Sequence, residues 1–344
     1  MAAYFLRRFL LIIPTFLGIT LLVFAITRFV PGGPIERYMT AAMMAAGERG
    51  GGGQIVQMQQ NTLSEDQLAE LKAYYGFDKP TLSSYFSWLG RILRGDLGYS
   101  TRYNEPVWDV IKSRFPISIF YGIATLIITY GVCIPLGIAK AIRHSTSFDN
   151  ISSALVFIGY AIPGYVVGIA LITAFASHWE LFPLGEFVSD DFDSYSTTGK
   201  IVDVMHHAVL PLIAYVAGSF AVTTFMMKNA LMDNLAADYV RTAIAKGLPY
   251  RQAIFGHAFR NSLIPIATSF GGNISLILTG SFLIETIFNI DGFGLLGFES
   301  LLDRDYPVVM GILVISSILF LLGNILSDFC VALVDPRVKF GEER

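Results

Sequence analysis

The chain has 344 residues, of which 53% are hydrophobic and only 15% are charged. A soluble domain of this length needs more charge on its surface, so the composition excludes an ordinary soluble protein and indicates a membrane protein. The formal net charge of −3 provides no basic surface for nucleic acid, and no nucleic-acid partner is expected. Cys133 and Cys330 both lie in apolar stretches, which favours buried thiols over a disulfide or a metal pair.

Apolar stretches recur at roughly the twenty-residue length that a helix needs to cross a bilayer core of about 30 Å. They predict six transmembrane helices, at about residues 9–27, 117–139, 151–176, 208–227, 262–284 and 308–329. The predicted fold is therefore an all-α integral membrane protein with a long first exterior loop. Several spans contain proline, which membrane bundles tolerate because neighbouring helices and water satisfy the freed carbonyl groups. Pro163–Gly164 in the third span has two interpretations, a simple kink or a point of flexing during gating.

The connecting loops alternate in charge along the chain. Bases dominate the N-terminal tip, the second and fourth loops and the tail (Arg7, Arg8; Lys140, Arg143; Lys228, Arg241, Lys246, Arg251, Arg260; Arg337, Lys339, Arg344), whereas the short third and fifth loops are acidic. Because loops rich in bases stay in the cytoplasm, both termini are predicted to be cytoplasmic. The expected parts are the tip and first helix (1–30), the exterior loop (31–116), a five-helix domain (117–334) containing a cytoplasmic loop (228–261), and the tail (335–344).

The first exterior loop contains helical patterns of its own. A capping box at Ser64–Gln67 opens one amphipathic helix, and apolar residues at a 3.6-residue period predict a second near residues 82–93. Asn104 and the following Glu105-Pro106 predict a third short helix that ends near Phe115. The Gly-rich run at 47–53 is expected to be a hinge and not a phosphate loop, since no Gly-Lys-Ser/Thr follows it.

The usual signs of autonomous chemistry are missing. No span carries a charged residue near its middle, which argues against an ion-coupled carrier. Adjacent His206 and His207 face different sides of a helix and have no partners that complete a metal set. No catalytic residue, no metal site and no bound cofactor are expected, and a membrane-anchored enzyme is disfavoured. With no Walker sequence, the chain cannot drive uphill transport alone.

The loop between the fourth and fifth spans has the pattern of two short helices joined at a fixed bend. Asp238 near the start and Lys246 near the end of the first helix suit its dipole. Gly247 suits a left-handed C-cap, and Pro249 can restart a helix that runs to about Phe259. Two short helices held between spans form a rigid lever that can pass motion from a soluble partner into the bundle.

This loop carries a resemblance to a known family. Tyr239–Leu248, followed by His257–Pro265, resembles the cytoplasmic loop of ATP-binding-cassette importer permeases, most closely the first permease type of the dipeptide/oligopeptide branch. Of the general importer pattern Glu-Ala-Ala-x-x-x-Gly, only the second alanine (Ala243) and the glycine (Gly247) are kept. Further segments are similar to that branch: 4–8 through 31–34, 76–80, 94–100, 285–288, 304–307 and 334–337. The third loop is similar to a subgroup that imports longer peptides and the peptide antibiotic microcin C.

The resemblance implies a type I importer bundle in the bacterial inner membrane and a set of partners. These are a second homologous permease, two ATPase subunits that bind the ATP, an external solute-binding protein and membrane lipid. It also implies that the coupling helix, which docks on the ATPase, is formed by Tyr239, Arg241, Thr242, Ala243, Lys246 and Gly247. The alternative interpretation is that the bases here only obey the positive-inside rule.

The pathway for the cargo is less defined by the sequence. Asn273, Ser275 and Thr279 of the fifth span are candidate lining residues, although polar residues at helix interfaces explain them equally well. The implied cargo is di- or oligopeptides. Nickel or an oligosaccharide carried by the same architecture, and more distantly an ion-coupled carrier without an ATPase, remain as alternatives.

Overall fold

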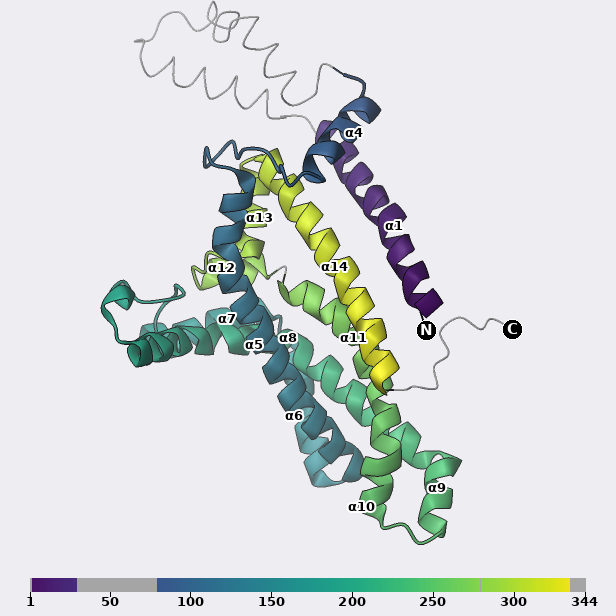
Figure 1. Ribbon diagram of the computed structural model, residues 1–344. Coiled ribbons are helices and arrows are strands. Elements are labelled where there is room, and N and C mark those ends of the chain that lie inside the picture. The colour runs from purple at the N-terminus through teal and green to yellow at the C-terminus, as the bar shows by residue number, and fades with distance from the viewer. Residues whose placement is uncertain (1, 30–78, 279, 335–344) are drawn as a thin grey trace, which may run out of the picture. The chain divides into compact units, whose positions relative to one another are not determined.

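The computed structural model describes residues 2–29, 79–278 and 280–334 (Figure 1). Within these residues the protein is helical and has no strand, only an isolated bridge between Tyr99 and Pro106. The all-α prediction is confirmed. The α-helices are α1 (Ala2–Phe29), α4 (Thr81–Ile92), α5 (Val107–Ile142), α6 (Ser147–Ala161), α7 (Gly164–Leu171), α8 (Thr197–Ala236), α9 (Asp238–Ala245), α10 (Tyr250–Ala253), α11 (Phe259–Leu278), α12 (Phe282–Ile287), α13 (Phe293–Leu302) and α14 (Tyr306–Val334). Short π-helical segments follow α7 (Ile172–His178) and α10 (Ile254–Ala258), and a 3-10 turn covers Phe192–Ser194.

Four helical segments within the described residues are long and apolar enough to cross a membrane, namely Leu6–Thr27, Val107–Ile142, Thr197–Ala236 and Tyr306–Val334. The bent pair Ser147–Ala161 and Gly164–His178 supplies a fifth if the pair counts as one span. The expected fifth span is divided between α11 and α12. The chain is thus a multi-spanning protein, and the count of six remains a prediction.

The third predicted span differs from the expected single helix. α6 ends at Ala161 and α7 begins at Gly164, with a bend of 93° between α6 and the helical segment Gly164–His178. Pro163 explains the break, because the residue before a proline is driven out of the helical region, and Ile162 is extended (φ −97°, ψ 120°). The kink foreseen at this position is therefore an interruption of the helix.

The first loop agrees with its prediction in one place and departs from it in another. α4 confirms the amphipathic helix expected near residues 82–93. The separate short helix ending near Phe115 is wrong, because α5 runs unbroken from Val107 through Pro116 to Ile142. Proline removes one hydrogen bond, but its fixed φ is helical, and buried residues on both sides, Ile111 and Ser118, keep the helix packed. The capping-box helix and the Gly-rich hinge lie outside the described residues.

The chain divides into two compact units, and α1, α5 and α14 contribute to both. One unit comprises Ile13–Ser113 and Leu296–Ser317. Its core joins α1, α4 and α14 through Phe24, Tyr85, Leu89 and Met310, and the hydroxyls of Thr20 and Tyr85 are 2.9 Å apart. Residues 95–106 meet α13 and its C-terminal end: Asp305, fully buried, accepts hydrogen bonds from Ser100 Oγ and from the main-chain nitrogens of Thr101 and Arg102.

The other unit comprises Met1–Ile12, Arg114–Leu295 and Ile318–Arg344. One of its cores gathers Tyr121, Leu210, Ala214, Ile284 and Phe288, and the other gathers Met227, Leu231, Val240, Ile254 and Ile266. α11 and α14 meet backbone to backbone, since a Cβ on Gly271 would overlap the carbonyl of Gly323. Beside this crossing, Ser327 Oγ donates to the carbonyl of Ala267 at 2.8 Å.

Within this second unit, loops one, three and five contact one another, and loop four contacts the C-terminal end of α14. Arg114 pairs with Asp291 at 2.8 Å, and the main-chain nitrogen of Glu186 donates to the carbonyl of Phe288 at 2.7 Å, joining loops one, three and five. Loop four meets the end of α14 through Arg260 Nε and the Val334 carbonyl (2.7 Å). Near the N-terminus, Arg8 pairs with Asp328 of α14 at 3.1 Å.

Candidate coupling site

The predicted pair of short helices joined by a bend forms directly after α8. Figure 1 labels these two helices α9 and α10. Ala237 alone, in an extended conformation, separates α8 from α9. The bend closes as a Schellman motif: the Leu248 nitrogen donates to the Ala243 carbonyl (3.1 Å) and the Gly247 nitrogen to the Ile244 carbonyl (2.9 Å). Gly247 has a φ of +94°, which only glycine adopts without strain. α10 then starts after Pro249, so the bend has a fixed geometry.

The inner side of this hairpin is anchored to the bundle. Val240 is fully buried against Met227 and Leu231 of α8 and against Ile254. A hydrogen-bond chain adds a second anchor: Tyr239 Oη donates to Asn234 Oδ1 of α8 at 2.6 Å, and Asn261 Nδ2 of α11 donates to Tyr239 Oη at 3.0 Å. The hairpin is therefore joined to both flanking helices, as a lever must be.

The outer side of the hairpin is open to solvent. Of the predicted coupling residues, Tyr239, Arg241, Thr242, Lys246 and Gly247 are exposed, and Ala243 is half-buried. Apolar side chains share this exposure, with Ile244 at 38%, Tyr250 at 52% and Phe255 at 48%. The surface therefore offers three cations, Arg241, Lys246 and Arg251, and several apolar groups, a composition suited to a protein partner with acidic residues.

Of the three candidate pathway residues, only Asn273 has a described side chain. Asn273 is half-buried and its Nδ2 donates to Tyr130 Oη of α5 at 2.8 Å, so it joins two helices. The side chain of Ser275, and Thr279 altogether, lie outside the described residues.

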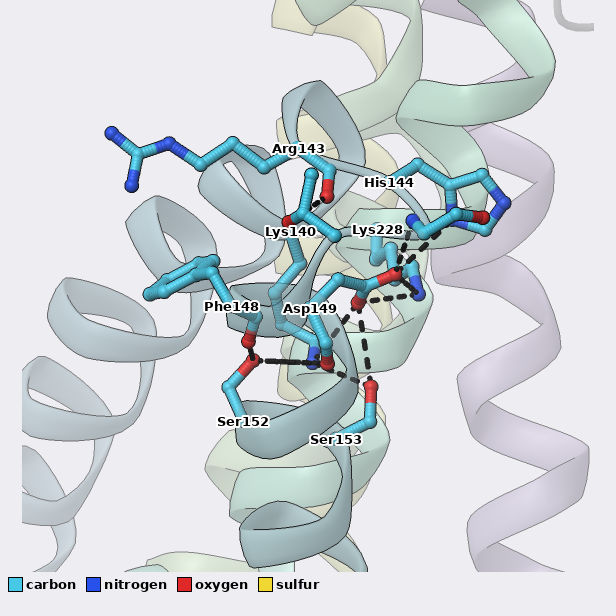
Figure 2. Close-up of polar contacts among 10 residues, drawn as sticks. Lys140, Arg143, His144, Phe148, Asp149, Ser152, Ser153 and Lys228 are labelled. Carbon is cyan, nitrogen blue, oxygen red and sulfur yellow. Dashed lines mark hydrogen bonds and ion pairs between the residues drawn. The ribbon is translucent and has the colours of Figure 1, made fainter.

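A buried cluster of charges near the hairpin was missed by the sequence analysis. It consists of Lys140 at the end of α5, Asp149 in the first turn of α6 and Lys228 in α8, and we call it the Asp149 cluster. Figure 2 shows the three side chains converging from these helices. Lys228 Nζ lies 2.7 and 2.8 Å from the two carboxylate oxygens of Asp149, and Lys140 Nζ lies 3.3 Å from one of them.

The Asp149 cluster is shielded and its polar atoms are satisfied. Lys140, Asp149 and Lys228 are 0%, 2% and 8% exposed. Lys140 Nζ also donates to the hydroxyls of Ser152 (2.8 Å) and Ser153 (2.7 Å) and to the main-chain oxygen of Asp149 (3.1 Å). Removing one partner from such a buried set leaves an uncompensated charge, which costs about 3–5 kcal/mol. Arg143, by contrast, points away from the cluster in Figure 2.

The sequence did contain a signal for this cluster. The analysis counted Lys140 and Lys228 among the bases that hold loops in the cytoplasm. Asp149, however, is the only acidic residue between Asp109 and Glu180. Asp149 is thus a single acid in a long apolar region, and Lys140 and Lys228 are bases at the ends of two predicted spans. This pattern indicates that the acid is a buried partner for those bases.

A second buried carboxylate, Glu285 of α12, is held in a different way. It is 2% exposed, accepts a hydrogen bond from the Leu295 nitrogen at 2.6 Å and one from Tyr215 Oη at 3.1 Å. A Cβ on Gly292 would lie 2.6 Å from its carboxyl carbon, so glycine leaves the space that the carboxylate fills. No lysine or arginine pairs with it among the residues described here.

Comparisons with known proteins define the class to which this bundle and lever belong. Residues 133–340 match the family described as binding-protein-dependent transport system inner membrane component. The chain belongs to this family, the permease subunits of ATP-binding-cassette importers of the type I fold. It is therefore a multi-pass inner-membrane protein that works with an ATPase and a solute-binding protein, and an ion-coupled carrier no longer explains it.

Individual relatives match along almost their whole length. The chain is 40% identical to the peptidoglycan transport system permease protein YejB of Agrobacterium fabrum, over 359 residues that cover 99% of each chain. It is 34% identical to the dipeptide transport system permease protein DppB of Escherichia coli K12, covering 98% of this chain and 99% of that protein. It is also 34% identical to the oligopeptide transport system permease protein AppB of Bacillus subtilis, covering 99% and 100%. The predicted resemblance to the dipeptide/oligopeptide branch is confirmed.

Proposed function

We propose that this chain forms one half of a pathway that imports peptides across the inner membrane. It pairs with a second homologous permease, receives cargo from an external solute-binding protein and is driven by two ATPase subunits. The chain itself holds no cofactor and catalyses no reaction, and ATP is bound and hydrolysed on the partner subunits. The names of relatives that match over 98–99% of this chain, which refer to dipeptides, oligopeptides and peptidoglycan, support a peptide-containing cargo.

Two narrower proposals about the cargo are supported by fewer observations. A microcin C-like peptide rests on the similarity of the third loop alone. Nickel and oligosaccharide remain the competing cargoes within the same architecture, and the ligand that co-purifies with the solute-binding protein distinguishes them. Asn273 remains a candidate lining residue, together with Ser275 and Thr279.

The observation that carries the proposal is the hairpin at α9 and α10. Its inner side is fixed to α8 and α11, while its outer side presents Arg241 and Lys246 beside exposed Ile244 and Tyr250. A surface held rigidly to two spans transmits the motion of whatever binds it. We therefore assign residues 239–247 to the docking of an ATPase subunit.

The orientation follows from the same proposal. The hairpin loop must face the cytoplasm to reach an ATPase, and Arg260 at its end contacts the carboxyl end of α14. Arg8, near the N-terminus, contacts Asp328 of α14. These contacts support a cytoplasmic position for both termini, for the loop at 228–261 and for the tail at 335–344, with residues 31–116 outside.

The test is purification of the complex through a tag on this chain, in mild detergent, with the ATPase activity of the eluate measured. We expect Gly247→Pro to lose the ATPase subunits while the second permease still co-elutes, because proline cannot adopt a φ of +94°. Gly95→Pro is the matched control, since Gly95 has a φ of +80° in the expected exterior loop. Loss of the ATPases in both variants would indicate misfolding, and retention in both would contradict the coupling role.

Charge reversal separates docking from orientation. We expect the double variant Arg241→Glu and Lys246→Glu to reduce co-purified ATPase, whereas reversal of exposed Lys112 in the expected exterior loop leaves it unchanged. Unchanged ATPase in the double variant would mean that these bases only obey the positive-inside rule. A wild-type chain that elutes alone and moves solute without ATP would overturn the importer assignment.

A further inference from the structure

The Asp149 cluster lies directly on the path from the hairpin into the bundle. Lys228 is two turns from the end of α8, and Ala237 alone separates that helix from α9. Any displacement of the hairpin that moves the end of α8 therefore also moves Lys228. Both carboxylate oxygens of Asp149, at the start of α6, are bonded to the Lys228 ammonium. The negative charge in the first turn of α6 is further favoured by the helix dipole.

Few side chains of α6 are buried against its neighbours. Its only buried residues are Asp149 and Val156. A cavity of about 290 Å³ lies beside it, lined by α5, α6 and α8 residues that include Leu136, Leu155 and Ala217. About two turns further along α6 from Asp149, the ring centroid of Phe157 lies 4.7 Å from that of Phe225 in α8. The charged contact is therefore the most shielded link between α6 and α8.

α5 and α8, in contrast, are packed closely at the same level. A Cβ on Gly137 would lie 2.7 Å from the Cβ of Met227 and 2.8 Å from the Thr224 carbonyl oxygen, so the two backbones approach as near as glycine permits. Lys140, one turn further along α5, reaches the carboxylate from this packed pair. α5 and α8 thus form a common base from which two lysines hold α6.

At its C-terminal end, α6 does not continue into the next helix. Ile162 and Pro163 interrupt the helix, and the segment that follows is bent away by 93°. α6 is consequently a rigid segment of 15 residues with a break at one end and the Asp149 cluster at the other. A segment of this kind can rotate about the break, and its N-terminal end then moves together with the Asp149 cluster.

We propose that Asp149 is a positioning residue for transport: held by Lys228 and Lys140, it makes α6 follow the coupling end of α8 when the ATPases close. This inference rests on the proposed function, because it needs an ATPase that moves the hairpin. Asp149 acts through the two lysines and does not contact cargo or nucleotide. A cluster that served only to hold the fold together would leave the movement of α6 independent of its charges.

The experiment measures distances by pulsed electron paramagnetic resonance in the purified complex, without nucleotide and with ADP and vanadate. Both native cysteines are first replaced by alanine. One spin-label pair, at Ile151 of α6 and Ile213 of α8, reports whether the two helices move together, and both side chains are exposed. A second pair, at Ile151 and exposed Ile318 of α14, reports whether α6 moves at all.

In the wild-type cluster we expect the Ile151–Ile318 distance to change with nucleotide and the Ile151–Ile213 distance to stay constant. The test variant combines Lys140→Met, Asp149→Leu and Lys228→Met, which removes the charges without leaving any of them unpaired, so that folding is retained. In this variant we expect the Ile151–Ile213 distance to change with nucleotide. Asp233→Asn, at an exposed acid on α8, is the matched control.

Several outcomes would overturn the inference. They are a wild-type Ile151–Ile213 distance that changes with nucleotide, a wild-type Ile151–Ile318 distance that does not change, and an apolar variant that behaves as the wild type. The amount of ATPase that co-purifies is recorded for every sample. Absence of ATPase from the wild-type sample is a failure of the proposed function, whereas ATPase present with unlinked helices is a failure of this inference alone.

Discussion

Two of the buried carboxylates, Asp149 and Glu285, are held by different kinds of partner. Asp149 and Glu285 are each 2% exposed. Asp149 is bonded to two ammonium groups, that of Lys140 on the preceding helix α5 and that of Lys228 on α8, which is distant in sequence. Glu285 is bonded to a main-chain nitrogen and a tyrosine hydroxyl, within a loop closed by glycine. The chemistry of the partners decides which segments of the chain each carboxylate connects.

The difference follows from reach and from charge. Lysine side chains are long, so an acid held by lysines can join helices whose backbones stay apart, as Asp149 joins α6 to α5 and α8. Main-chain donors are short, so the Leu295 nitrogen holds Glu285 to the turn between α12 and α13, and the Tyr215 hydroxyl adds one neutral link to α8. The lysine arrangement also leaves charges behind when the acid is removed, and the neutral arrangement does not.

The largest effect is expected when Asp149 is replaced by alanine. This change leaves two buried ammonium groups without a carboxylate, which costs about 3–5 kcal/mol of stability. Thermal denaturation of the detergent-solubilised protein, followed by size-exclusion chromatography, measures the loss. Asp233→Ala, at an exposed acid of α8, should stay within about 0.5 kcal/mol of the wild type. Equal stability of the two variants would show that Lys140 and Lys228 find water or another anion.

Glu285→Ala should cost less, about 2–3 kcal/mol. It leaves the Leu295 nitrogen and Tyr215 hydroxyl without an acceptor, and each unsatisfied buried donor costs about 1–3 kcal/mol, but no unpaired charge remains. The same denaturation assay applies, with exposed Glu105→Ala as its control. A loss as large as that of Asp149→Ala would mean that Glu285 has a cationic partner outside the described residues.

Gly292→Ala should have the smallest effect, about 1–2 kcal/mol. The new methyl group would lie 2.6 Å from the carboxyl carbon of Glu285 and must push it aside, an overpacking of ordinary cost. In the Glu285→Ala background the methyl has room, so the two changes should be non-additive by at least about 0.5 kcal/mol. Gly218→Ala, with no atom close to the new methyl, is the control. Strict additivity would contradict the view that glycine is required there to make room for the carboxylate.

Much of the fold was predictable because it depends on local patterns. Apolar length located the spans, and the Gly247–Leu248–Pro249 sequence located the bend, since a left-handed glycine followed by proline is a local signal. The exposed faces of Arg241 and Lys246 followed from the same short segment. Pro163 indicated a discontinuity, but its size depends on how α7 packs against α8 and so could not be read from the chain.

The errors came from tertiary contacts. The short helix predicted to end near Phe115 instead continues through Pro116 as α5, because residues on both sides of the proline are packed. Lys140 and Lys228 obeyed the positive-inside rule and were counted as loop charges, because their burial depends on Asp149 arriving from another helix. The sequence near Glu285 gave no sign that Tyr215 of another helix would bond to it.

The crossing of α11 and α14 has a consequence for the history of the sequence. No side chain fits at residue 271, because a Cβ there would overlap the backbone of Gly323. Every descendant that keeps these two helices in contact must keep glycine at this position, whatever it transports. Invariance at this position among related permeases would thus record the spacing of two helices and carry no information about cargo.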